Sequence, residues 1–241
     1  GPAAALPAAA AQEPVLETRM TAAAFFDVDG TLLAGNVVSY YVRLRTFDMP
    51  RLRRALWTAG FALTVPWWFG LDKRSRAAFQ RAFYRNYRHI APAELERRAR
   101  AHFERHMAPR LYPGALRRLR EHQARGDQVV LVTGSLRVLV APLAEHVGAT
   151  ALLAPDLRQA NGVFTGELEG EPLAAGRKAD AVTDFVRRHG FDAAHCHAYA
   201  DSLDDVPMLR RVGRAAVVDP SRALRRVAAR EGWEILSWRH W

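Results

Sequence analysis

Two carboxylates two residues apart are the part of this sequence best suited to chemistry. Asp27 and Asp29 come directly after the apolar run 24–26, and Gly30 follows them. Because alternate residues of an extended segment point to the same side, both side chains can face one pocket at the carboxyl end of a strand. Two anions this close repel each other, and the pKa of one rises unless a cation lies between them. Mg²⁺ suits that place, since it binds one or two carboxylates together with substrate phosphate oxygens.

A calcium loop is an alternative that the same spacing allows. Such a loop carries a glutamate six residues after the glycine, and Asn36 stands at that place here. A surface turn that happens to hold two acids is the other alternative, but hydrophobic residues lead straight into the pair. The pattern therefore favours a buried strand that ends in a site for a metal ion and a phosphate group.

Two further segments could bind the phosphate group. An apolar strand candidate, residues 128–133, ends at Thr133 and is followed by Gly134. A helix comes next, and the first backbone N–H groups of a helix are suited to binding phosphate. Lys178 begins another helix and could offset the repulsion between the phosphate and the carboxylates. It is one of only two lysines among 35 basic residues, which favours a functional role over a solvated side chain.

A second group of acids follows a strand candidate at residues 195–200. Asp201, Asp204 and Asp205 stand together directly after this apolar segment. Three acids at the end of one strand need a cation to be tolerated together. These acids, like those around residue 27, therefore predict a nearby cation.

In this order the segments resemble the motifs of the haloacid dehalogenase superfamily, in particular its phosphoserine phosphatase-like branch (subfamily IB). The first motif of that family, Asp-x-Asp-x-Thr followed by two apolar residues, matches residues 27–33, and the resemblance extends to about Leu209. It implies a Mg²⁺-dependent phosphomonoesterase that forms an aspartyl-phosphate. Two departures are Ala200, where the family usually has glycine, and Asp204, where this branch commonly has asparagine, so the role of Asp204 stays open.

The resemblance also assigns roles to single residues, since a carboxylate nucleophile divides phosphate hydrolysis into two displacements and a second carboxylate can transfer the protons. These residues are Asp27 as nucleophile and metal ligand; Asp29 as general acid and base and, through its backbone carbonyl, as metal ligand; Thr133, Gly134 and Lys178 around the phosphate; Asp201 as metal ligand; and Asp205 as an acid that holds metal-bound water or Lys178.

Strands that alternate with helices must position these motifs. They predict an α/β fold with a Rossmann-like, mainly parallel sheet, and residues 157–168 are expected to form a hairpin around Asn161-Gly162. Residues 36–110 follow a helical pattern and are too many for a loop, so we expect an inserted helical cap. The predicted core comprises residues 20–35 and 111–241. Residues 1–19 are expected to be a leader outside the folded part, with Met20 as a plausible native start.

Composition limits the class of protein. A hydrophobic content of 49% indicates a packed core. The net charge of +10 is spread over helical segments without the signature of a nucleic-acid-binding module, so no nucleic acid partner is expected. Cys196 is the only cysteine, which fits a reducing, cytoplasmic compartment. A metal site on His195, Cys196 and His197 is disfavoured because neighbouring strand residues point to opposite faces.

The acidic residues also help to choose among functions. A haloacid dehalogenase needs no metal and generally lacks the second aspartate, so Asp29 and Asp201 favour phosphate chemistry. A phosphomutase stays open, whereas a non-catalytic scaffold would predict loss of these acids. In phosphoserine phosphatases a glutamate near the first motif recognises the substrate amine. Asn36 stands there, so we expect a cap contact from Asn36 and a small phosphate ester other than phosphoserine as the preferred substrate.

The cap segment contains sixteen consecutive uncharged residues, 56–71, which basic residues flank on both sides. The run is short for a membrane-spanning helix, which needs about 20 residues, and Pro66 interrupts it. One interpretation makes it the core of the cap. The other makes it an interfacial segment that touches an anionic membrane, with a phosphorylated lipid as substrate. The sequence does not predict the oligomeric state.

Overall fold

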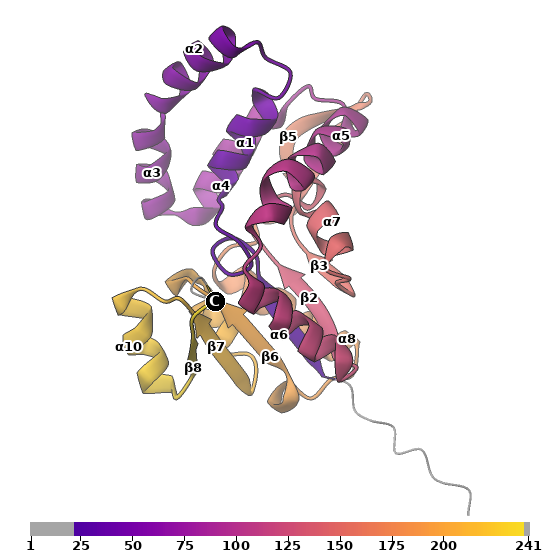
Figure 1. The fold of residues 1–241 in the computed structure, drawn as a ribbon, viewed down its shortest axis with the longest axis vertical. Helices are drawn as coiled ribbons and strands as arrows, with labels where there is room; N and C mark the ends of the chain where they lie inside the picture. The colour runs from indigo at the N-terminus through magenta and orange to yellow at the C-terminus, as the bar shows by residue number, and fades with distance from the viewer. Residues whose placement is uncertain (1–21, 239–241) are drawn as a thin grey trace, which may run out of the picture.

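A six-stranded parallel sheet forms the centre of the computed structural model, which describes residues 22–238 (Figure 1). Its strands, in spatial order, are β3 (Ala151–Leu153), β2 (Gln128–Val132), β1 (Ala23–Asp27), β6 (His197–Ala200), β7 (Arg214–Val218) and β8 (Glu234–Leu236). Every pair of neighbouring strands is parallel. The predicted α/β fold with a mainly parallel sheet is confirmed, and the predicted leader lies outside the described residues.

Both faces of the sheet are buried, which explains why its strands read as continuous apolar runs. Along β1, Ala24 and Phe26 pack on one face, while Ala23 and Phe25 pack on the other. One face is covered by α6 (Pro113–Ala124) and α7 (Arg137–His146), and the other by α8 (Gly176–Arg188), α9 (Val206–Leu209) and α10 (Arg222–Glu231).

The order of the strands reverses at β1. The chain proceeds from β1 to β2 and β3 on one side, and from β6 to β7 and β8 on the other. Open α/β sheets bind ligands at such a reversal, outside the carboxyl ends of the strands. Asp27, Thr133 and Asp201 all lie at this edge, because they end or directly follow β1, β2 and β6.

The long segment between β1 and α6 is helical. Its helices are α1 (Val37–Arg45), α2 (Arg51–Ala62), α3 (Val65–Arg74), α4 (Arg76–Tyr84) and α5 (Pro92–His102), followed by irregular helical turns over 103–110. Aromatic rings hold α1 to α4 together, and Tyr41 contacts Trp57, Phe61, Phe83 and Tyr87 at centroid distances of 5.3–6.0 Å. The division of the chain into core and cap stays a prediction.

A hairpin packs on this helical segment. It consists of β4 (Asp156–Ala160) and β5 (Val163–Glu169), and β5 contacts α4 and the turn at 85–87. Asn161 and Gly162 have φ values of 51° and 77°, which suit the two-residue turn that the sequence predicts. The hairpin prediction is therefore confirmed.

One strand prediction needs correction, and one strand was missed. The strand expected at 195–200 begins only at His197, because Ala193–His195 forms a helical turn whose cap is Asp192. The side chain of Asp192 accepts a hydrogen bond from the Ala194 N–H at 2.9 Å. The edge strand β8 was not predicted, since Glu234 and Ile235 are exposed and leave no apolar pattern.

The interpretation of residues 56–71 as the core of the cap is only half right. Neither α2 nor α3 has a fully buried residue. Trp57, Phe61 and Trp68 pack partly against the core, whereas Leu63 and Trp67 are exposed. One side of this helix pair packs against the other helices of the segment, and the opposite side is exposed to solvent.

Candidate active site

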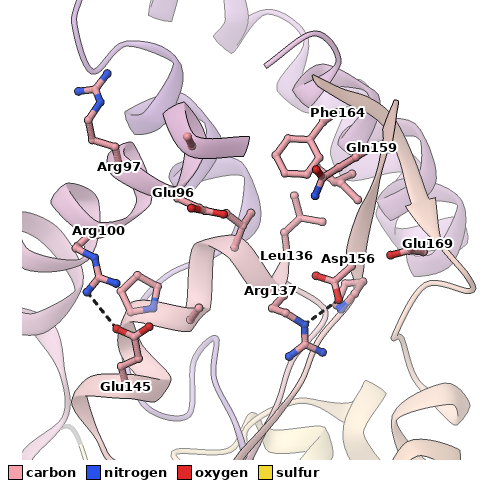
Figure 2. Close-up of a pocket in the computed structure, with 16 residues that line it drawn as sticks. Glu96, Arg97, Arg100, Leu136, Arg137, Glu145, Asp156, Gln159, Phe164 and Glu169 are labelled. Carbon is pink, nitrogen blue, oxygen red and sulfur yellow. Dashed lines mark hydrogen bonds and ion pairs between the residues drawn. The ribbon is translucent and has the colours of Figure 1, made fainter. Parts of the chain in front are cut away.

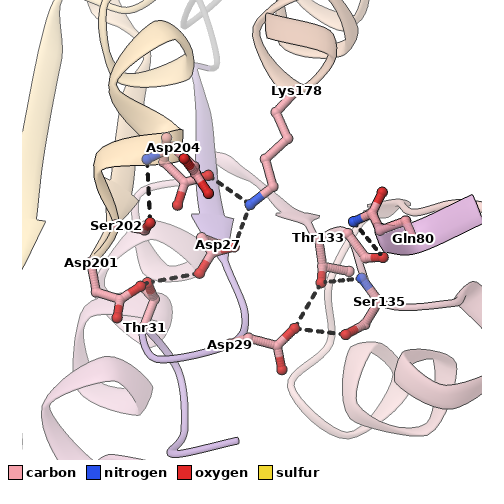
Figure 3. A network of polar contacts seen from close by, with 12 residues as sticks. Asp27, Asp29, Thr31, Gln80, Thr133, Ser135, Lys178, Asp201, Ser202 and Asp204 are labelled. Carbon is pink, nitrogen blue, oxygen red and sulfur yellow. Dashed lines mark hydrogen bonds and ion pairs between the residues drawn. The ribbon is translucent and has the colours of Figure 1, made fainter. Parts of the chain in front are cut away.

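A buried lysine between two carboxylates is the centre of the site (Figure 3). The Nζ atom of Lys178, in the first turn of α8, lies 2.6 Å from Oδ1 of Asp27 and 2.7 Å from Oδ1 of Asp205. None of the three residues is more than 7% exposed. The sequence separates these groups by 151 and 27 positions, and the carboxyl edge of the sheet brings them together.

The charges at this centre do not balance. Burial raises the pKa of Asp27 to about 8, although Lys178 acts in the opposite direction. Burial alone would lower the pKa of Lys178, but the carboxylates of Asp205 and Asp27 outweigh it and raise that pKa. One ammonium group therefore faces Asp27, Asp201 and Asp205, whose carboxylate oxygens lie within 4.8 Å of one another. This all-oxygen, electron-rich set fits a hard divalent cation such as Mg²⁺.

Thr31 and Gly30 allow Asp27 and Asp201 to lie close together. The Thr31 hydroxyl donates to Oδ2 of Asp27 at 3.0 Å and lies 3.4 Å from Oδ1 of Asp201. Gly30 has φ +96°, and a Cβ atom there would lie 2.1 Å from Oδ2 of Asp201. Only glycine therefore combines this turn with the close approach of Asp201.

Hydroxyl groups hold the second carboxylate. Tyr40 of α1 donates to Oδ1 of Asp29 at 2.7 Å, and Ser135 donates to Oδ2 at 2.7 Å. The Thr133 hydroxyl also lies 3.3 Å from Oδ2 and accepts a hydrogen bond from the Ser135 backbone at 3.0 Å. Asp29 is thus fixed beside Asp27 but outside the lysine pair.

Helix α4 contacts the loop after β2. Gln80 donates to the Gly134 carbonyl at 3.2 Å, and the Tyr84 hydroxyl donates to the same oxygen at 2.6 Å. Gln80 and Arg76 line the cavity of about 50 Å³ at the acids. The contacts from the helical segment, including that of Tyr40, were missed, because the rotation of a helix relative to a distant loop leaves no local sequence signal.

Two residues singled out in the sequence lie at the margin. Asn36 does not line this cavity; its side chain caps α1 by accepting from the Ser39 N–H at 2.9 Å, and the residue borders a neighbouring cavity. Asp204 is exposed and lines the cavity, whereas Asp205 next to it is buried against Lys178. The structure thus separates the two adjacent acids by environment.

A larger cavity of about 560 Å³ lies between α5, α7 and the hairpin (Figure 2). It contains none of the predicted site residues. Charged side chains on its wall pair with each other, since Arg137 lies 2.8 Å from Asp156 and Arg100 lies 3.1 Å from Glu145. Each of these two arginines is thus neutralised by a neighbouring acid.

The fold and the acidic edge define a hydrolase of known type. Residues 24–210 match the family model of the haloacid dehalogenase-like hydrolases. The chain belongs to this family, which confirms the resemblance found in the sequence.

Individual relatives agree with this assignment. The chain is 34% identical to a Mycobacterium tuberculosis protein named phosphoserine phosphatase SerB1, over 91% of this chain and 72% of the relative. A Bordetella pertussis protein described as of unknown function shares 25% identity with a TM-score of 0.76, covering 90% of this chain and 98% of that protein. A phosphoserine phosphatase structure without ligand, 18% identical, gives a TM-score of 0.65 over 90% and 93% of the two chains, and shows the common fold.

Proposed function

We propose that this protein is a Mg²⁺-dependent phosphomonoesterase that forms an aspartyl-phosphate on Asp27. The observation that carries the proposal is the buried Asp27 carboxylate, 2.6 Å from the Lys178 ammonium, beside a second carboxylate that hydroxyl groups hold in place. Lys178 lies where it can attract the phosphate and keep Asp27 oriented toward it. Asp205 in turn holds the ammonium group at 2.7 Å.

The reaction takes two displacements at phosphorus. An Asp27 carboxylate oxygen forms a bond to phosphorus while the bond to the leaving alcohol breaks, and Asp29 gives its proton to the alcohol oxygen. Asp29, now a carboxylate, takes a proton from water, whose oxygen attacks phosphorus as the bond to Asp27 breaks. Free phosphate leaves, and both aspartates return to their starting states.

The metal would be held by the acids at the sheet edge. Asp27, Asp201 and the backbone carbonyl of Asp29 are the proposed ligands, and the ion would neutralise charge on the phosphoryl oxygens. The requirement for a cation is supported by the excess of carboxylates over the single ammonium group. Asp29 and Asp201 disfavour a dehalogenase, which shares the aspartate nucleophile but needs no metal and generally lacks the second aspartate.

The substrate is proposed to be a phosphate ester other than phosphoserine, although the mycobacterial relative bears that name. Among the described residues of the helical segment, those that line the active-site cavity are Val37, Arg76 and Gln80, none of which is anionic. Asn36 is neutral, and its side-chain oxygen already caps α1. A substrate ammonium would therefore find no anionic partner among these residues of the helical segment.

Hydrolysis of p-nitrophenyl phosphate with Mg²⁺, and with the metal chelated, tests the chemistry. Asp27→Asn is nearly isosteric, so the fold should survive while kcat falls on the order of 10⁴-fold or more. A fully active Asp27→Asn enzyme, shown by mass spectrometry not to have deamidated, would overturn the proposal. For the substrate, phosphoserine with the highest kcat/KM in a panel of phosphate esters would refute the second part.

A further inference from the structure

The outer side of α2 and α3 exposes large apolar side chains. Six of them are between 39% and 84% exposed: Leu52, Leu56, Leu63, Val65, Trp67 and Phe69. We call these six residues the α2–α3 surface. In Figure 1 the two helices form the outer border of the molecule, beyond α1 and α4. A group of apolar side chains of this size on one border indicates a binding surface.

Basic residues surround this apolar surface. Arg51, Arg53, Arg54, Lys73 and Arg74 are all exposed. The one acid between residues 51 and 74 is Asp72, and it pairs with Arg76 at 2.8 Å. The combination of tryptophan, leucine and phenylalanine with arginine and lysine is typical of a helix that lies in the headgroup region of an anionic membrane.

The charge pattern also argues against the main alternatives. A second copy of the chain would bring two basic surfaces together, and like charges across an interface are unfavourable. A helix surface that faces only solvent is typically polar, whereas this one exposes Trp67 and Phe69. Within residues 22–238, no helix combines the length and apolar character that crossing a bilayer requires. Contact with one leaflet is therefore the arrangement to consider.

A mainly apolar cavity lies between this surface and the active-site cavity and shares wall residues with both. It measures about 290 Å³ and lies between α1 and the pair α3–α4. Val65 and Phe69 belong both to the α2–α3 surface and to the wall of this cavity. Val37 and Arg76 line both this cavity and the active-site cavity. A hydrocarbon chain placed here would thus end beside the active-site cavity, where an anionic headgroup would compete with Asp72 for Arg76.

We propose that the α2–α3 surface docks on an anionic membrane and that the protein dephosphorylates a lipid phosphomonoester, whose chain enters this apolar cavity. The docking rests on the surface alone, whereas the choice of substrate rests on the phosphatase function proposed above. Trp57 and Trp68 serve a different purpose, because they pack inward against the aromatic cluster.

Sedimentation with vesicles tests the docking. The probes are phosphatidylcholine vesicles and vesicles that also contain phosphatidylglycerol, at about 0.01 M and about 1 M salt, where the Debye length falls from about 30 Å to about 3 Å. We expect binding to the anionic vesicles at low salt and release at high salt. The triple variant Leu52→Ser/Leu56→Ser/Trp67→Ser should bind at least about tenfold more weakly, because it removes three apolar contacts.

Charge reversal supplies a matched control. Arg51→Glu/Arg53→Glu should weaken vesicle binding by about fivefold or more per residue. Arg225→Glu/Arg226→Glu changes the net charge equally but alters exposed arginines of α10, so its binding should fall far less. Equal losses in the two variants would show that net charge alone, rather than this surface, drives binding, and would overturn the proposal.

Activity on two substrates separates this proposal from the previous one. With phosphatidic acid in the vesicles, hydrolysis should fall together with binding in the triple variant, while p-nitrophenyl phosphate hydrolysis stays unchanged. The melting temperature should fall only slightly, because the ring contact of Trp67 with Trp68 is lost. Hydrolysis of p-nitrophenyl phosphate without any vesicle binding at low salt would refute the docking but leave the phosphatase standing. Vesicle binding without hydrolysis of either substrate would support the docking and refute the phosphatase function. A dimer that the triple variant abolishes, in a protein that ignores vesicles, would assign the surface to a second copy.

Discussion

The two lysines of the chain lie in two regions with opposite physical properties. Lys178 is buried at the sheet edge and contacts two carboxylates at 2.6 and 2.7 Å. Lys73 is exposed at the end of α3, where its ammonium group lies 4.6 Å from the centre of the Phe69 ring. In the first region charges are buried and paired, and apolar groups enclose them. In the second region apolar groups are exposed, and the charges around them face solvent.

This difference suits the two regions to different tasks, one to a reaction at a fixed site and the other to binding a partner surface. A buried set of charges is costly to assemble and keeps its geometry, which suits chemistry at a fixed point. An exposed apolar surface with solvated charges gains free energy only when something covers it. Substitutions of the same type in both regions therefore measure what each region contributes.

Replacing each lysine in turn should give the largest difference in the free energy of unfolding. Lys178→Met leaves Asp27 and Asp205 buried without their cation, and we expect a loss of about 3–5 kcal/mol in the free energy of unfolding. Lys73→Met removes an exposed cation over an aromatic ring and should cost less than about 1 kcal/mol. Urea unfolding of both variants with the metal chelated measures the difference. Similar values for the two would contradict the description of a charged, paired core.

A pair of glycine variants should give the next largest effect. Gly30→Ala places a Cβ atom 2.1 Å from Oδ2 of Asp201 in a backbone conformation with positive φ. We expect a loss of about 1–3 kcal/mol and weaker Mg²⁺ binding, because Asp201 must move. A Cβ atom at Gly60, in α2, meets nothing within 4 Å, so Gly60→Ala should stabilise the protein by up to about 1 kcal/mol. Thermal unfolding with and without Mg²⁺ checks both signs.

The affinity for Mg²⁺ should rise with pH. Burial raises the pKa of Asp27 to about 8, so without a bound cation the folded protein keeps a proton there that the unfolded chain releases near pH 4. That proton favours the folded state at low pH, and its contribution disappears as the pH rises toward 8. Mg²⁺ must displace the proton, so its affinity should increase by at most about tenfold per pH unit between pH 6 and 8.

The shift in melting temperature on adding Mg²⁺, measured at several pH values, tests this dependence. Asp27→Asn is the control, because an amide has no proton to release, and its Mg²⁺ response should vary less with pH. A wild-type response that is the same at pH 6 and pH 8 would show that Asp27 is already ionised at the lower pH.

The smallest effect is expected from a single hydroxyl group. Tyr40→Phe removes the hydrogen bond to Asp29 at 2.7 Å. It should lower kcat about tenfold, the lower end of the roughly 1.5–3 kcal/mol that a bond to a charged group contributes, because the hydroxyl groups of Ser135 and Thr133 still hold Asp29. Tyr87→Phe is the control, because the buried Tyr87 hydroxyl has no hydrogen-bond partner among the described residues. Steady-state kinetics on p-nitrophenyl phosphate should show no loss for Tyr87→Phe. An equal loss in both variants would indicate general damage to the helical segment.

The parts of the site that the sequence could predict are those that follow strands. Asp27, Thr133 and Asp201 each end or follow a parallel strand, so the sheet alone gathers them at one edge. Lys178 was found by its rarity and its place at a helix start. Their catalytic roles stay a proposal.

The parts that could not be predicted depend on how helices dock. Tyr40 and Gln80 reach the site only because α1 and α4 have a particular rotation above the sheet edge, which no local pattern encodes. For the same reason Asn36, correctly placed near the first motif, borders another cavity. The exposed side of α2 and α3 matches one of the two interpretations that the sequence left open, because an uncharged run with basic flanks is compatible with both a buried core and an interface.

The small volume at the acids has a consequence for the timing of the reaction. The cavity at the acids measures about 50 Å³, less than a tenth of the cavity of about 560 Å³ between α5, α7 and the hairpin. We therefore expect this space to widen before a phosphate ester binds at Asp27, and α4, which donates two hydrogen bonds to the Gly134 carbonyl, is the element that would have to move. The chain crosses between the sheet and the helices twice, and the Tyr112 N–H donates to the Leu32 carbonyl at 2.9 Å where the crossings meet. Under the proposed function, we expect such a motion to turn about this paired crossing, on the microsecond-to-millisecond scale of loop and domain opening.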